Sequence, residues 1–324
     1  MSGWPTSSSF FEVIMTFSVS KKAERKKTTT HNAARRDNIR GWLFTAPFAI
    51  IFTLFLIVPL TYAFYISLFT YTQVKGEYFS GFANYVRVFH DQTFWAGMGR
   101  VVVYTLTMVP IQLGLALFFA LLLDVIKNKF ASFSRLIIFL PYAIPGVIGA
   151  LMWGFMYSKN MGPFTTIFGM LGLRTPDFLT SSGIFGALVN VVTWQWTGYY
   201  MVILYSALQS ISHDIYESAR LDGASEFKIA TQIKTPMISG SIVMVTIFSL
   251  IGTLQFYTEP TVLRNQAPTA ILPEYTPNMY AQALAFGYDQ TNYSATVSFA
   301  LGILVVIFSV IFMKLTHKQS GLGD

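Results

Sequence analysis

Between residues 216 and 236 the chain has a segment whose residue types predict two short helices separated by a sharp bend. Gly223 can adopt a positive φ angle at little cost, and Asp222 beside it can accept hydrogen bonds from backbone amides at the turn. Small and apolar residues alternate with charged ones on both sides. The segment can therefore lie against a membrane surface and still present polar groups to a partner. The positions that carry this interpretation are Glu217, Ala219, Asp222, Gly223, Ala224, Ile233 and Pro236.

Two apolar stretches flank this segment, and each carries aromatic and hydrogen-bonding side chains at helical spacing. Residues three, four or seven apart share one face of a helix. The candidates for a substrate path on these faces are Gln195, Trp196, Tyr199, Ser249, Thr253 and Phe256. Aromatic faces combined with amide and hydroxyl groups suit a sugar, which offers apolar ring faces and hydroxyls. The alternative is that the same residues hold helices together or lie at the membrane interface.

The elements that must position these residues are membrane helices. The chain is 53% hydrophobic and 11% charged, whereas soluble domains contain about 25% charged residues. Six stretches contain no Asp, Glu, Lys or Arg: Gly41–Val74, Val101–Leu123, Leu136–Ser158, Phe178–His213, Thr235–Thr258 and Gln290–Met313. A helix of the shortest length, 23 residues, spans roughly 34 Å, enough for a hydrocarbon core of ~30 Å. The fold class is therefore all-α integral membrane, with six transmembrane helices.

Within these stretches the expected helices are Leu43–Thr70, Val101–Leu123, Leu136–Tyr157, Ile184–Ser206, Pro236–Tyr257 and Ser294–Lys314. Pro110 predicts a kink in the second helix, and Pro141 and Pro145 lie near the start of the third. The residues between the first and second helices, from Thr72 to about Trp95, are expected to form a loop on the outer side of the membrane.

The distribution of basic residues predicts the orientation. If the N-terminus is cytoplasmic, sixteen of the 22 basic residues fall on cytoplasmic segments and six on outer loops, as the positive-inside rule requires. The cytoplasmic set is Lys21, Lys22, Arg25, Lys26, Lys27, Arg35, Arg36, Arg40, Lys127, Lys129, Arg135, Arg220, Lys228, Lys234, Lys314 and Lys318. Both termini are therefore expected in the cytoplasm. The expected domains are a disordered basic arm (1–40), a transmembrane domain (41–316) containing the cytoplasmic loop 209–236, and a tail (317–324).

Several function classes are disfavoured by residues that the sequence lacks. There is no cysteine, and no Gly-x-x-x-x-Gly-Lys-Ser/Thr phosphate-binding loop occurs, so no ATPase motor is expected in this chain. None of the six predicted spans contains an ionisable residue. This disfavours a proton-coupled carrier, an intramembrane protease and a metalloenzyme, and it favours a neutral substrate. The basic residues flank membrane spans, so no nucleic-acid partner is expected.

The segment around Gly223 closely resembles the EAA motif of the membrane-spanning (permease) subunits of ABC importers. That motif reads roughly Glu-Ala-Ala, two residues, Asp-Gly-Ala, and then Ile-x-x-Pro after about eight more. The seven positions named above match it in type and spacing, while Ser218 replaces the central alanine with another small residue. The similarity to the maltose and glycerol-phosphate type of carbohydrate-uptake permease extends over about residues 42–316.

This resemblance implies a non-catalytic permease subunit in a bacterial cytoplasmic membrane. Such a subunit pairs with a homologous second permease, most often as a heterodimer, and the two enclose a path for a sugar or oligosaccharide. Two partner ATPase subunits, which bind ATP and Mg, each grip one EAA loop, and an external binding protein delivers the substrate. The resemblance also favours the six candidate path residues as a group, because its sugar-lining positions flank the EAA loop.

Two other classes stay open at this stage. One is the same importer type for another solute, such as a polyamine, a peptide or glycerol phosphate. The other is a membrane scaffold or sensor without transport activity, in which the loop is a connector only. Co-purification with an ATPase would argue against the scaffold.

Overall fold

The computed structural model describes residues 41–126 and 129–316, which are mainly helical and include one short hairpin. The predicted basic arm (1–40) and tail (317–324) lie outside the described residues. The chain divides between Ala63 and Phe64 into two compact units, and each is described by itself.

The first helix, Gly41–Ser67, is apolar on all sides and none of its most apolar stretch is buried. A helix of this kind suits lipid contact along its whole circumference. A π-helical turn, η1 (Thr53–Ile57), leads into α2 (Val58–Ser67). The turn ends two residues before Pro59, which has no amide hydrogen to donate. The helix was expected to continue to Thr70, but it ends three residues earlier.

A hairpin replaces the expected end of that helix and part of the expected outer loop. Strand β1 (Phe69–Thr72) pairs antiparallel with β2 (Gly76–Phe79), so that Phe69 lies opposite Phe79. The short helix α3 (Ala83–His90) follows. Its buried Asn84 donates its side-chain amide to the carbonyls of Ser67 and Phe69, which ties α3 to the start of the hairpin.

The second membrane helix, α4 (Gln92–Val125), begins nine residues before the expected Val101. Asp91 caps it by accepting hydrogen bonds from the amides of Thr93 and Phe94. The hydroxyls of Tyr280 and Tyr293 also donate to Asp91, at 2.8 and 2.7 Å. Burial alone would raise the pKa of Asp91, but these hydrogen bonds together hold it below its ordinary value.

These two tyrosines belong to α14 (Pro277–Phe286) and α15 (Thr291–Thr316), the last helices of the described chain. The Asp91 carboxylate therefore joins the start of α4 to both of them. The hairpin lies near the same end, where Asn292 of α15 donates to the Ile66 carbonyl and to Glu77.

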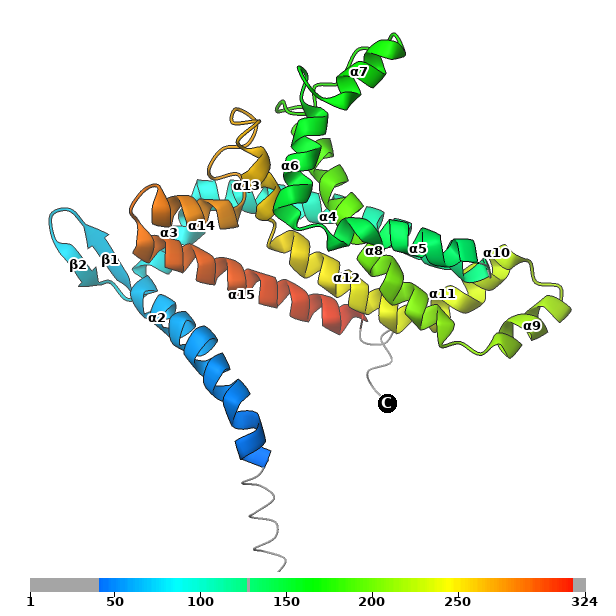
Figure 1. Cartoon of the computed structure of the whole chain (residues 1–324). Coiled ribbons are helices and arrows are strands. Elements are labelled where there is room, and N and C mark those ends of the chain that lie inside the picture. Colours follow the sequence, from blue (N-terminus) through cyan, green and yellow to red (C-terminus); the bar gives the residue numbers. More distant parts are fainter. Residues whose placement is uncertain (1–40, 127–128, 317–324) are drawn as a thin grey trace, which may run out of the picture. The chain divides into compact units, whose positions relative to one another are not determined.

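The expected third span is not one straight helix. Helix α5 (Lys129–Ala143) and α6 (Gly146–Tyr157) meet at an angle of 96°. Pro145 disfavours helical geometry at the preceding Ile144, so the helix breaks there. Helix α6 and the short α7 (Pro163–Met170) project away from α5 (Figure 1), and α6 packs on the first half of α8 through Tyr157.

Helices α8 (Ile184–Gln209), α4, α12 (Ser239–Leu254) and α15 form the centre of the second unit (Figure 1). The chain leaves the helix after α12 and resumes it as α13 (Thr258–Leu263). Four helical segments of the described chain are long and apolar enough to cross a membrane, and the bent pair α5–α6 supplies a fifth. The 26-residue α8 has the length, but its polar and aromatic residues make it less apolar. Each predicted span thus has a helical counterpart.

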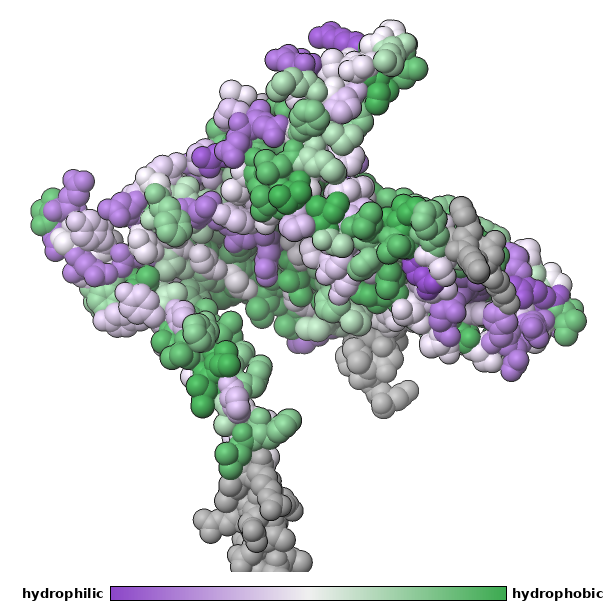
Figure 2. All heavy atoms as spheres, in the orientation of Figure 1, coloured by the Kyte–Doolittle hydropathy of each residue, from purple (hydrophilic) through white to green (hydrophobic). Residues whose placement is uncertain are grey.

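The segment after α8 lies at the end of the bundle opposite the hairpin (Figure 1). It consists of α9 (His213–Leu221), α10 (Glu226–Ile229), the π-helical turn η2 (Ala230–Lys234) and α11 (Thr235–Met237). Figure 2 shows hydrophilic residues gathered over this end and over the hairpin, with hydrophobic surface between them. That distribution is typical of a protein whose middle lies in a bilayer.

Helix α5 packs tightly on α8 because Gly198 has no side chain. A Cβ atom at this position would lie 2.0 Å from the carbonyl oxygen of Ile138. Small residues allow membrane helices to approach in this way. On the same helix, a Cβ at Gly186 would meet nothing within 4 Å.

We therefore expect Gly198→Ala to destabilise the purified protein by about 1–3 kcal/mol, because backbone atoms must move to admit the methyl group. Gly186→Ala is the matched control, since both changes raise helix propensity equally. Denaturant titration of both variants in detergent measures the difference. Equal stability of the two variants would contradict this packing.

Candidate functional site

The bend predicted at Gly223 is present and has the geometry of a Schellman motif. Gly223 has a φ angle of +82°, the only positive φ in the segment from α9 to α11. Its amide donates to the carbonyl of Arg220, and the amide of Ala224 donates to that of Ala219. The expected role of Asp222 is not observed, because no backbone amide in the described ranges donates to its carboxylate. Backbone groups alone close the turn.

The bend exposes a mixed polar and apolar surface, which we call the α9–α10 surface. Leu221 and Phe227 are 90% and 79% exposed, and the carboxyl-bearing Glu217 and Asp222 are also exposed. The segment thus presents large apolar and acidic side chains together. An ion pair, Arg220 with Glu226 at 2.6 Å, crosses the bend on its exposed side.

A buried ion pair fixes this segment to the bundle. Lys234, the last residue of η2, lies 2.5 Å from one carboxylate oxygen of Asp124 near the end of α4. The Gln209 side chain, at the end of α8, donates to the other oxygen at 2.7 Å. The side chains of Lys234 and Asp124 are 4% and 7% exposed. One carboxylate therefore joins the ends of α4 and α8 to the segment that follows the bend.

Tyr216 of α9 completes this junction. Its ring lies beneath the Lys234 ammonium, 4.6 Å from the centroid, in a cation–π contact. Burial, together with the nearby Asp124 carboxylate, raises the pKa of Tyr216 to about 12. We refer to Asp124, Gln209, Tyr216 and Lys234 as the junction cluster. None of the four was predicted to be functional, and the only signal in the sequence was an Asp at the end of an otherwise uncharged stretch.

Four of the six candidate path residues border a single cavity of about 230 Å³ in the centre of the second unit, which we call the central cavity. They are Trp196, Ser249, Thr253 and Phe256. The lining also includes polar groups outside the six candidates, among them Gln112 of α4 and Glu259 of α13. Ser249 donates to the side-chain oxygen of Gln112 at 2.6 Å, which joins α12 to α4.

The remaining two candidates, Gln195 and Tyr199, are not in the lining of this cavity. The Gln195 side-chain amide donates to the carbonyl of Ile144 at 3.1 Å, where the α5–α6 bend frees that carbonyl. Tyr199 stacks on Tyr142 of α5, with ring centroids 4.5 Å apart. In this structure both residues serve the contact of α8 with α5 and α6.

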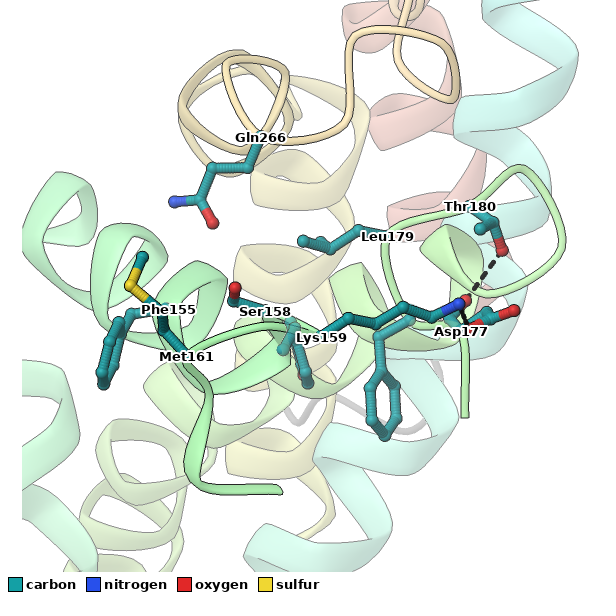
Figure 3. A pocket seen from close by; sticks show the side chains of 10 residues that line it. Phe155, Ser158, Lys159, Met161, Asp177, Leu179, Thr180 and Gln266 are labelled. Atoms are coloured by element: carbon teal, nitrogen blue, oxygen red, sulfur yellow. Dashed lines mark hydrogen bonds and ion pairs between the residues drawn. The ribbon is translucent and has the colours of Figure 1, made fainter. Parts of the chain in front are cut away.

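A larger cavity, of about 540 Å³, lies beside the outer end of α6 (Figure 3). Its charged groups, Lys159 and Asp177, are paired with each other, and the Gln266 side chain points toward it from the loop after α13. None of the candidate path residues borders it. The candidate path residues that the structure brings together thus lie at the central cavity.

The comparison with known families decides the identity. Residues 80–318 match the family model described as "Binding-protein-dependent transport system inner membrane component". The chain belongs to this family. It is thus the inner membrane component of a binding-protein-dependent transport system, and the resemblance seen in the 216–236 segment is confirmed at the family level.

Relatives of this inner membrane component support the assignment over nearly its whole length. It is 30% identical to the lactose transport system permease protein LacF of Rhizobium radiobacter, over 87% of this chain and 96% of the relative. It is 29% identical to the trehalose/maltose transport system permease protein MalF of Thermococcus litoralis, over 86% of this chain and 94% of the relative. It is 28% identical to the arabinooligosaccharides transport system permease protein AraP of Bacillus subtilis, over 87% of this chain and 90% of the relative.

The fold of the component is that of a solved importer subunit. It superposes on a chain of a bacterial alginate ABC transporter, crystallised with an alginate-bound periplasmic protein, with a TM-score of 0.77. The two chains are 20% identical, and the match covers 89% of this chain and 99% of the other. The predicted permease fold is therefore confirmed.

The junction cluster generates a stability prediction. Lys234→Met leaves the Asp124 carboxylate buried without its cation, and we expect a loss of about 3–5 kcal/mol together with loss of transport. The double variant Asp124→Leu/Lys234→Met removes both charges and is expected to recover most of that stability. Glu226→Gln breaks an exposed pair and serves as the control, with an expected change below about 1 kcal/mol. Denaturant titration of the purified component measures the free energy of unfolding of each variant. A double variant that is no more stable than Lys234→Met would refute the pairing.

Proposed function

We propose that this component is the permease subunit of an ATP-driven importer for sugars or oligosaccharides. It forms the substrate path together with a homologous second permease, and an external binding protein delivers the sugar. The names of its relatives, which specify lactose, trehalose/maltose and arabinooligosaccharides, support this substrate class. Two partner ATPase subunits bind ATP and Mg and supply the energy, so this chain has no catalytic role.

One observation supports a role in coupling the ATPase subunits to the path: the α9–α10 surface is fixed to the helix bundle by buried contacts. Its exposed Leu221 and Phe227 offer an apolar contact for a partner protein, and the bend at Gly223 sets their position. The junction cluster connects this surface to the ends of α4 and α8. A movement of the ATPase subunits is therefore transmitted through this buried ion pair to the helices that line the central cavity.

The proposed arrangement places residues 41–316 as the transmembrane domain, with loop 209–236 and both termini in the cytoplasm. The charge distribution along the sequence supports this orientation. ATP can shift the path between outward and inward access only if the ATPase pair binds it more tightly in one of the two states.

The coupling role predicts that Gly223→Pro abolishes sugar uptake, because proline fixes φ near −65° and cannot occupy the +82° bend. The matched control is Gly172→Pro. Gly172 also has a positive φ, +65°, and open space around it, but it lies after α7. Both variants are tested in proteoliposomes with the partner subunits and binding protein, by ATPase activity and by uptake of lactose and maltose. Normal stimulated ATPase activity and uptake in Gly223→Pro would refute the coupling role.

The path role predicts that Thr253→Val raises the half-saturation concentration for uptake about 5- to 100-fold, because a buried hydrogen-bonding group in the lining is lost. Thr246→Val is the control. Thr246 lies on the same helix and also donates to a backbone carbonyl, but it does not border the central cavity. Both variants are expected to assemble with the ATPase subunits. Equal uptake kinetics of the two variants would place the path elsewhere.

A further inference from the structure

Glu259 is a buried carboxylate in a span that was predicted to be uncharged. The fifth span was expected to end near Tyr257, but the apolar segment continues to Leu263 and so includes Glu259. The residue is only 9% exposed. It borders the central cavity, whose lining also includes the aromatic rings of Trp196 and Phe256.

No other residue in the described part of the chain pairs with this carboxylate. Its recorded interactions are with its own backbone amide, and no lysine or arginine of the described ranges forms an ion pair with it. Two of the cavity hydroxyls point to other acceptors, because Ser249 donates to Gln112 and Thr253 to the carbonyl of Leu250. A buried carboxyl group whose donor is its own backbone amide is poorly satisfied, so donors from outside the chain would stabilise it.

The backbone beside Glu259 is also unusual for a membrane segment. Helix α12 ends at Leu254 and α13 begins at Thr258, so that the chain between them is not helical. Irregular backbone at membrane depth is tolerated where it is buried in protein or lines a polar cavity. Here the residues of the break, from Gln255 to Tyr257, all border the central cavity together with Glu259. Broken helices of this kind mark the binding sites of other membrane transporters.

We propose that Glu259 is the specificity-determining residue of the central cavity and selects neutral sugars over acidic ones. Its carboxyl group accepts hydrogen bonds from sugar hydroxyls, and these donors favour the ionised form, to which hydrogen bonds are stronger than those between neutral groups. The rings of Trp196 and Phe256 offer apolar surface to the sugar ring. A uronate or phosphate brings a second negative charge near the first in a medium of low dielectric constant, and is therefore rejected. This inference rests on the proposed sugar-import function.

The test uses the complete membrane complex in nanodiscs without the binding protein, so that the selectivity of the binding protein does not enter. Equilibrium dialysis measures the binding of radiolabelled lactose, maltose, trehalose and arabinotriose, with digalacturonate as the acidic competitor. Glu259→Gln removes the charge but keeps the shape. Glu77→Gln is the matched control, because Glu77 is exposed in the hairpin and does not border the cavity. Uptake by the wild-type complex with its binding protein is measured in parallel.

We expect Glu259→Gln to weaken binding of the preferred neutral sugar by about 10- to 100-fold, the loss typical of a hydrogen bond to a charged group. Digalacturonate should compete in this variant but not in the wild type or in Glu77→Gln. Unchanged sugar binding in Glu259→Gln, or competition by digalacturonate in the wild type, overturns the inference. Failure of Glu259→Gln to assemble also overturns it, because the carboxylate would then be paired with a partner subunit. If the wild type neither binds nor imports any of the four sugars, the proposed function itself fails.

Discussion

The ion pair between Asp124 and Lys234 is the contact that fixes the segment from α9 to α11 to the bundle. Both groups are removed from water, so each needs the other, and the second oxygen of the carboxylate is satisfied by Gln209. The pair brings together residues 110 positions apart in the chain and the ends of three elements, α4, α8 and η2. Since two of these helices also contribute residues to the central cavity, the loop and the cavity belong to one connected body.

At the opposite end of the bundle another carboxylate joins the ends of three helices, α4, α14 and α15. The Asp91 carboxylate accepts four hydrogen bonds, two from backbone amides of α4 and two from tyrosines of α14 and α15. Between the two ends the contacts are mostly apolar, with close approach at Gly198 and the Ser249–Gln112 hydrogen bond. Hydrogen bonds to carboxylates thus fix the helix ends, where water is near, while small residues and shape complementarity fix the middle, where lipid gives no hydrophobic advantage to helix association.

The sequence predicted the spans and the bend well because both depend on local properties. An uncharged stretch of 23 residues has few alternatives to a membrane helix, and the turn at Gly223 needs only a residue that tolerates positive φ. The junction cluster and the contributions of α4 and α13 to the cavity lining depend on distant contacts and could not be read from spacing, whereas Pro145 is a local signal for the break between α5 and α6. Gln195 illustrates the limit: its position on a shared helical face was compatible with the cavity, but the free carbonyl of Ile144 engages it instead.

The π-helical turn Ala230–Lys234 has a consequence for how this segment can vary in length. The amide of Thr235 donates to the carbonyl of Ala230, five residues earlier, so that the turn holds one residue more than an α-helical turn. Loss of that residue would leave a continuous helix but rotate its two halves by about 100° relative to each other. The extra residue therefore sets the rotational phase between the bend and the bundle, and insertions or deletions here would redirect the α9–α10 surface without unfolding any helix.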